Sequence, residues 1–254
     1  MNKHILPLLL VLAWSPASAQ DWVSLFDGES LDGWTPKIRG YPAGENFANT
    51  FRVEDGAITV SYDGYESFED RFGHLFYRTP YSSYRLRLEY RFFGDQASGG
   101  EAWAWRNSGV MFHSQAPETM PAGQDFPISL EFQFLGGPED GEARPTAAMC
   151  SPGTEVHIDG VMAADHCVPS NAPTFVGDDW VQVELLVEGS ERAVHIVDGE
   201  AVIEYGDFEF GGGVVNGHDP AMKPDGELIP GGYIALQSES HPIQFRRIEI
   251  LVLD

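Results

Sequence analysis

The chain has 254 residues, of which 43% are hydrophobic, so it can fill a sizeable core and general disorder is excluded. Thirty-nine Asp and Glu against 15 Lys and Arg give a formal net charge of -24. This charge argues against a nucleic-acid partner, because affinity for phosphate backbones comes largely from basic side chains.

Residues 1–19 have the features of a secretory signal peptide. Lys3 supplies a positive start, an apolar run follows over residues 5–14, and residues 17–19 form a small-residue cleavage site. The apolar run is too short to span a bilayer, and no later segment is long and apolar enough to cross one. We therefore expect a single mature domain over residues 20–254, periplasmic or secreted, without membrane insertion.

Alternation of apolar and polar residues predicts strands along most of the chain. The first are expected at residues 22–26, 51–54, 57–62 and 75–78. In residues 83–92 the even positions are apolar and nearly all odd positions are charged, which predicts a strand with one buried and one solvated face. Further strands are expected at residues 108–113, 128–135, 181–188, 192–197 and 201–205.

The turns and the last strands complete the pattern. Asp198 and Gly199 lie between two apolar runs, which is a strong hairpin signal. Strands are expected at residues 233–238 and 243–253, with a bulge near Arg246 and Arg247, where the parity of the apolar positions changes. The 28 Gly and 17 Pro and the lack of helical periodicity predict an antiparallel all-β sandwich or barrel.

Two long irregular segments are expected, at residues 94–107 and 136–179. The second contains Cys150 and Cys167, the only cysteines of the chain. In an oxidising compartment a disulfide between them is favoured, and it would stabilise the fold by about 3 kcal/mol on the chain-entropy model. A metal site is the alternative, because His157 and His166 lie in the same stretch, but the closely spaced Cys pairs of structural zinc sites are missing.

Several motifs occur in an order known from one family. They are residues 25–34 (LFDGESLDGW), 88–92 (LEYRF), 107–112 (NSGVMF), 130–133 (LEFQ), 180–183 (WVQV), 235–237 (ALQ) and 245–248 (FRRI). In order and spacing the chain resembles the secreted bacterial 3-keto-disaccharide (3-keto-glycoside) hydrolases, from about Trp22 to Leu253. The resemblance implies a concanavalin A-like jelly roll, a β-sandwich of two curved antiparallel sheets with the ligand site on the concave face.

The resemblance also implies chemistry on a carbohydrate substrate already oxidised at C3. The ketone acidifies the C2 hydrogen, so a base can remove that proton and the C1–O bond can break by elimination. Addition of water then completes a net hydrolysis. The reaction needs a base near C2, a hydrogen-bond donor or cation at the C3 oxygen, and an acid at the leaving oxygen. Metal-assisted relatives make a divalent metal ion the expected cofactor, and no organic cofactor is expected.

Candidate residues lie first on two neighbouring motifs. Glu131 and Gln133 share one face of their strand, which suits a base or metal ligand beside an amide that binds hydroxyls. The pair matches the family's Glu-x-Gln strand. Asn107 and His113 also share a face, and Gly109 between them leaves room for a ligand. We expect Asn107 to bind substrate and His113 to act as a base or, with Glu131, as a metal ligand. The alternative for His113 is a structural histidine at a strand end.

The C-terminal motif supplies a second set of candidates. Gln237, Glu239 and His241 follow one another at period two and could build an acid–base or metal cluster beside Arg247. We assign His241 to catalysis and Gln237 and Arg247 to substrate binding, with Glu239 less favoured. The alternative is a polar turn before the last strand.

Aromatic residues could complete a sugar site. Trp103 and Trp105 lie in a glycine-rich segment and are expected to stack on a sugar ring, although such residues also anchor small cores. The alternative function is a non-catalytic, lectin-like carbohydrate-binding module, because the same sheet serves both roles and fold does not separate them. A cluster of titratable groups would favour the enzyme, and a bare aromatic platform would favour the binding module.

Overall fold

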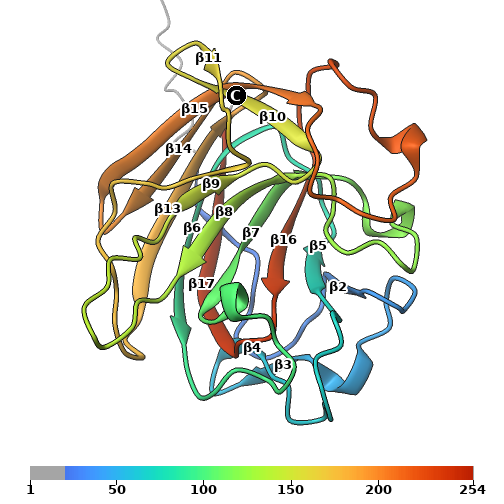
Figure 1. Cartoon of the computed structure of the whole chain (residues 1–254), viewed down its shortest axis with the longest axis vertical. Coiled ribbons are helices and arrows are strands. Elements are labelled where there is room, and N and C mark those ends of the chain that lie inside the picture. Colours follow the sequence, from blue (N-terminus) through green and yellow to red (C-terminus); the bar gives the residue numbers. More distant parts are fainter. Residues whose placement is uncertain (1–20, 254) are drawn as a thin grey trace, which may run out of the picture.

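The computed structural model describes residues 21–253, so the predicted signal peptide lies outside the described part of the chain. In this part the strands β1 to β17 form two antiparallel sheets, and helical structure is limited to short 3-10 turns (Figure 1). The turns are η1 (Phe47–Asn49), η2 (Ala102–Ala104), η3 (Pro117–Thr119) and η4 (Pro220–Met222). None of its helices is of a length and apolarity that would cross a membrane.

The larger sheet has ten strands, in the order β11-β10-β15-β14-β13-β6-β17-β4-β3, with β1 paired to β17. Their bounds are β1 (Val23–Ser24), β3 (Phe51–Glu54), β4 (Ala57–Val60), β6 (Ser83–Phe92), β10 (Thr154–Ile158), β11 (Val161–Met162), β13 (Val181–Glu188), β14 (Arg192–Val197), β15 (Glu200–Phe210) and β17 (Ile243–Val252). In β6 every second side chain is buried, as its alternation predicts.

The smaller sheet has seven strands, in the order β12-β9-β8-β7-β16-β5-β2. Their bounds are β2 (Trp34–Ile38), β5 (Gly73–Tyr77), β7 (Asn107–Ser114), β8 (Leu130–Leu135), β9 (Ala148–Cys150), β12 (Cys167–Val168) and β16 (Tyr233–Ser238). The core lies between the sheets, where Phe134 of β8 stacks on Tyr90 of β6 with ring centroids 4.2 Å apart. Two antiparallel sheets packed in this way are the predicted jelly-roll sandwich.

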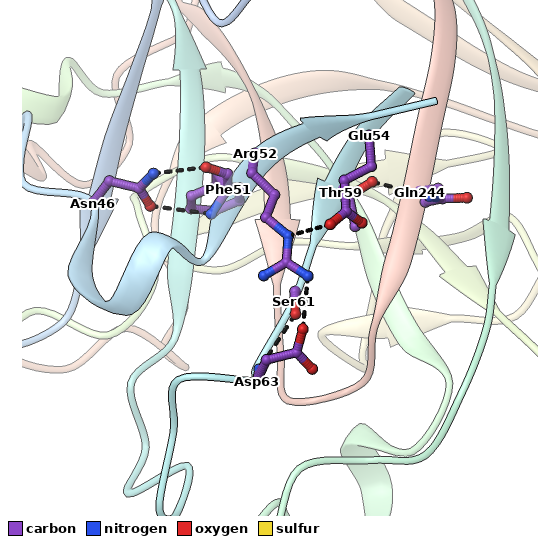
Figure 2. Close-up of polar contacts among 8 residues, drawn as sticks. All are labelled: Asn46, Phe51, Arg52, Glu54, Thr59, Ser61, Asp63 and Gln244. Atoms are coloured by element: carbon purple, nitrogen blue, oxygen red, sulfur yellow. Dashed lines mark hydrogen bonds and ion pairs between the residues drawn. The ribbon is translucent and has the colours of Figure 1, made fainter. Parts of the chain in front are cut away.

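The edge of the larger sheet is held by local polar contacts (Figure 2). Before β3, the Asn46 side chain accepts a hydrogen bond from Phe51 N (3.0 Å) and donates one to Phe51 O (2.6 Å). On β3 itself, Arg52 pairs with Glu54 and with Asp63, each at 2.7 Å. These contacts occupy backbone and charged groups that an exposed edge strand would otherwise offer to another chain.

Two local predictions about turns and bulges are confirmed. Asp198 and Gly199 both have positive φ, 49° and 85°, as the tight turn of a β-hairpin requires. Near the C-terminus, the register between β17 and β6 shifts after Arg246, and Arg247 has a φ of 53°. The change of parity in the sequence therefore does mark a bulge.

The segment 136–179 is more regular than the sequence predicts, because it contains β9 to β12. Cys150 of β9 and Cys167 of β12 lie directly opposite each other and form a disulfide. The disulfide is therefore confirmed, and neither thiol is free to bind a metal. Strand β2 was not predicted either, because Pro36 and Lys37 interrupt its apolar pattern.

Candidate active site

A pocket of about 450 Å³ opens on the face of the seven-stranded sheet that points away from the core. Asn107 of β7 and Glu131 and Gln133 of β8 contribute to its lining from the sheet, and Glu239 follows the end of β16. Connecting segments form the walls, with Trp103, Phe126, Arg144, Pro152, His166 and Val214. Strands therefore position the polar floor, and loops supply a mostly apolar rim.

Glu131 is held over a glycine of the neighbouring strand. Its side chain is 6% exposed, and Oε1 has no hydrogen-bond partner among residues 21–253. A Cβ placed on Gly109 would lie only 2.9 Å from Glu131 Oε1, so the absence of a side chain at Gly109 makes room for the carboxyl group. Burial raises the pKa of Glu131, because the charged form loses its hydration.

Glu239 brings a second carboxyl group to the pocket. It is 3% exposed, and its Oε2 is also without a partner in the described chain. Burial raises the pKa of Glu239 and the negative charge of Glu131 raises it further, whereas the cation of Arg144 opposes the shift. Two buried carboxyl groups that repel each other retain a proton near neutral pH, so one can be ionised while the other is protonated.

Arg144 is fixed on the pocket wall by backbone carbonyl groups. Its Nη1 donates to Gly136 O (2.8 Å) and Arg106 O (3.0 Å), and its Nη2 donates to Trp103 O (3.1 Å). Its guanidinium also lies over the Trp105 ring, 5.6 Å from the centroid. The result is a positioned positive charge beside Glu239. Sequence reasoning missed Arg144, because it lies in a segment without periodicity.

His241 and Trp105 lie together behind this wall and do not line the pocket. Their rings meet edge to face with centroids 6.0 Å apart, and His241 also packs against Phe92. Burial, and after it the cation of Arg106, lowers the pKa of His241 to about 4. A neutral imidazole near Arg144 can support the pocket wall. His241 does not contact the pocket, so its predicted direct role in catalysis gains no support from the structure.

The remaining predicted binding residues divide into two groups. Asn107, Gln133 and Trp103 line the pocket, as the sequence predicts for residues that bind substrate. Gln237 is fully buried beside the pocket, and in the described residues neither its amide oxygen nor its nitrogen has a partner.

His113 and Arg247 lie away from the pocket, which corrects their predicted roles. His113 has a φ of 47° at a register shift between β7 and β16, so its ring does not lie on the face of β7 that carries Asn107. It bonds to Gly189 O through Nε2 (2.8 Å) and packs against Phe208. Arg247 lies on the ten-stranded sheet and pairs with Glu89 at 2.6 Å.

Residues outside the strands of the floor complete the pocket, and of these only Trp103 is predicted from the sequence to bind substrate. Phe126 packs against Phe72, which stacks on Trp103, so Phe72 joins the two aromatic rings that line this side of the rim. On another side, Cys167 and His166 reach the pocket from the disulfide-linked strand. The sequence indicates His166 only for the alternative metal site, because strand pairing across the disulfide cannot be read from spacing.

The side chains present do not fit the expected metal site. Across residues 21–253 there is no group of three or more His, Cys, Asp or Glu side chains that could hold a metal ion. The pocket is lined by the carboxyl groups of Glu131 and Glu239 and the imidazole of His166, which do not form such a group, and His113 points elsewhere. Protein sites for divalent metals usually provide at least three such ligands, so we derive no step through a metal.

The two sheets and the pocket on the outer face of the smaller one define a protein of the jelly-roll β-sandwich class. Within this class, residues 21–251 match the family described as the 3-keto-alpha-glucoside-1,2-lyase-like domain, and the chain belongs to that family. No curated protein matches the chain.

Solved structures share the fold at low sequence identity. Two candidate glycosyl hydrolases from Parabacteroides distasonis ATCC 8503 are 18% and 17% identical, with TM-scores of 0.53 and 0.51. Each alignment covers 92% of this chain, and 100% and 94% of the respective structures. The Ca²⁺-bound exoplasmic/lumenal domain of VIP36 is 9% identical with a TM-score of 0.51, over 87% of this chain and 84% of that domain. These likenesses show the fold alone.

Proposed function

We propose that the protein cleaves 3-keto-glycosides by removal of the C2 proton and elimination of the group at C1. The observation that carries this proposal is the pair of buried carboxyl groups, Glu131 and Glu239, in one pocket. Membership of the 3-keto-alpha-glucoside-1,2-lyase-like family supports it. A binding module would gain nothing from two unpaired buried carboxyl groups, which cost stability, whereas acid–base catalysis needs groups with raised pKa.

The carboxyl pair can supply both proton transfers of the elimination. The ionised member accepts the proton from C2, and the electrons of that bond form C1=C2 as the C1–O bond breaks. The protonated member donates its proton to the departing oxygen, which leaves as an alcohol. The products are an unsaturated 3-keto sugar and the free aglycone, and addition of water to the double bond gives the 3-keto sugar of a net hydrolysis.

Other pocket residues would orient the sugar and balance its charge. Asn107 and Gln133 provide amide groups at the floor, and Asn107 Oδ1 has no partner within the described residues. The guanidinium of Arg144 supplies positive charge near Glu239 while an enolate forms. The aromatic rim with Trp103, which is 51% exposed, suits the C–H face of a pyranose ring.

The first experiment is an assay of the chain on a 3-keto-glucoside with a chromogenic leaving group, with the parent glucoside as control. Release from the keto-sugar alone is expected, because only the ketone acidifies C2. The Glu131→Gln variant should lose turnover and keep its fold. Parallel assays with EDTA and with added divalent ions test the predicted metal assistance. A protein that binds the keto-sugar but releases nothing from it would instead be the carbohydrate-binding module.

Export remains part of the proposal. The Cys150–Cys167 disulfide supports an oxidising location, because such bonds persist outside the cytosol. Expression of the full chain in a bacterium, followed by fractionation and mass determination, should find a periplasmic or secreted form that begins after Ala19. A full-length cytosolic product would contradict it.

A further inference from the structure

A second group of buried polar side chains lies beside the pocket and has no part in the chemistry above. Lys37 of β2 lies opposite His74 of β5, and His74 lies opposite Gln237 of β16. The three side chains form a polar row across adjacent strands, and they are 1%, 0% and 0% exposed. Their neighbours Ile38, Leu75 and Leu236 belong to the core, so by alternation the row faces the same side of the sheet as Glu131.

The polar row is poorly satisfied within the protein. Neither ring nitrogen of His74 and neither amide atom of Gln237 has a hydrogen-bond partner among residues 21–253. Lys37 Nζ reaches only Ile38 O, at 3.3 Å, and no ion pair in the described chain involves it. Each unpaired buried polar group costs about 1–3 kcal/mol, so a row of three indicates a ligand site rather than packing.

The polar row continues into the pocket. Leu236 lies opposite Val110, which brings Gln237 next to Gly109, and Gly109 is the residue over which Glu131 leans. The sheet therefore presents polar groups without interruption from Lys37 to Glu131.

Phe126 stands between the polar row and the pocket. It lines the pocket, and its ring meets the His74 ring edge to face at 6.0 Å. Phe126 belongs to the connection between η3 and β8 and is only partly buried, so it can move without disturbing a strand. A displaced Phe126 ring would join the row to the pocket.

We propose that Lys37, His74 and Gln237 form a second sugar-binding subsite, which Phe126 closes in this structure and which opens when a second sugar ring enters. This inference rests on the proposed function and deepens it. The occupant is an uncharged pyranose ring. Burial with the charge of Lys37 lowers the pKa of His74 to about 3, so His74 is a neutral imidazole that, beside the unpaired amide of Gln237, can donate to and accept from hydroxyl groups.

The test measures binding by calorimetry in the Glu131→Gln background, so that turnover does not interfere. The ligands are methyl 3-keto-glucoside, which has one ring, and a 3-keto-disaccharide. We expect the second ring to improve affinity by about tenfold, and we expect His74→Phe and Lys37→Met to remove this gain while affinity for the single ring stays within about twofold. His74→Gln keeps polar atoms at this position and should retain part of the gain in affinity. It therefore separates loss of the polar contacts from a folding defect. The matched control is His157→Phe on β10 of the other sheet, which should keep the full gain.

Phe126→Ala provides an independent arm. Because Phe126 also lines the first site, its removal should alter binding of the single ring as well, and the subsite predicts that association of the disaccharide becomes faster relative to that of the single ring. The subsite would be overturned if the Glu131→Gln protein with an unchanged polar row bound both ligands with equal affinity. It would also be overturned if His74→Phe and Lys37→Met kept the gain in affinity from the second ring. Failure of the proposed function is a different result, because it would appear as no release from any 3-keto-glycoside by the unmodified protein.

Discussion

The carboxyl group of Glu131 occupies the space that a side chain at Gly109 would need. A Cβ at Gly109 would lie 2.9 Å from Glu131 Oε1 and 2.8 Å from the carbonyl oxygen of Phe132 on the same strand. The second contact is with backbone, which cannot move away at low cost, and the first would displace the carboxyl group of Glu131. Gly109 thus lets strands β7 and β8 present a long carboxyl side chain over the floor of the pocket.

Gly109→Ala should therefore impair both the site and the stability of the fold. We expect kcat/KM for a 3-keto-glucoside to fall by about tenfold or more, because the base is displaced from its geometry. The midpoint of thermal unfolding should also fall, because the carbonyl oxygen of Phe132 cannot move away at low cost. Gly123→Ala is the matched control, since a Cβ there meets nothing within 4 Å, and its kinetics should be those of the unmodified protein.

The buried carboxyl pair predicts a stability that decreases as pH rises. Burial raises the pKa of both Glu131 and Glu239 above the ordinary value of 4.5, so between that value and the raised pKa the folded state holds more protons than the unfolded state. The free energy of unfolding should fall as pH rises through this window. Glu239→Gln should flatten the fall and be more stable than the native chain at about pH 8 in urea titrations. If the stability of the native chain varied with pH as little as that of the variant, the raised pKa values of the carboxyl pair would be contradicted.

His195 predicts the opposite dependence on the acid side. Its Nδ1 pairs with Ala147 O (2.9 Å) and its Nε2 with Tyr205 Oη (2.8 Å), between the sheets. Burial lowers the pKa of His195 to about 3, so below its ordinary value of 6.5 the unfolded chain takes up a proton that the folded chain refuses. Its contribution to stability is present above 6.5 and is lost as pH falls toward the lowered value.

His195→Phe isolates this effect. The substitution leaves Ala147 O and the Tyr205 hydroxyl unpaired, so we expect a loss of about 2 kcal/mol in urea unfolding near neutral pH. The loss relative to the native chain should shrink as pH falls from about 6.5 to about 4, since the variant has no imidazole to protonate. An equal loss at both pH values would mean that His195 does not remain neutral.

Reduction of the Cys150–Cys167 disulfide should affect both stability and the pocket. The bond joins residues 17 apart in sequence, so its loss should lower the free energy of unfolding by about 3 kcal/mol. Cys150 lies opposite Glu131 on the adjacent strand and Cys167 lines the pocket, so KM should rise on reduction. The Cys150→Ser, Cys167→Ser double variant should reproduce both changes and no longer respond to reductant. If this variant still responded to reductant, the effect would not come from the disulfide.

Periodicity predicted the candidate site only where it continued without interruption. Glu131 and Gln133 face the pocket because β8 is regular, so alternation alone gives their side. His113 has the same parity as Asn107 but points elsewhere, because the backbone turns to positive φ at His113. A single residue with positive φ can place its side chain on the opposite face of the sheet, and the local composition does not predict this conformation.

The sequence by itself determined the strands other than β2 and β9 to β12, the hairpin at Asp198 and Gly199, the partnership of the two cysteines and the all-β class. These features depend on local alternation, on turn chemistry and on there being just two cysteines to pair. Only the tertiary structure brought Glu239 to Glu131 and aligned Lys37 with His74 and Gln237. Those contacts follow from the order of strands β8, β7, β16, β5 and β2 in the sheet, which joins residues far apart in the chain and leaves no periodic trace in the sequence.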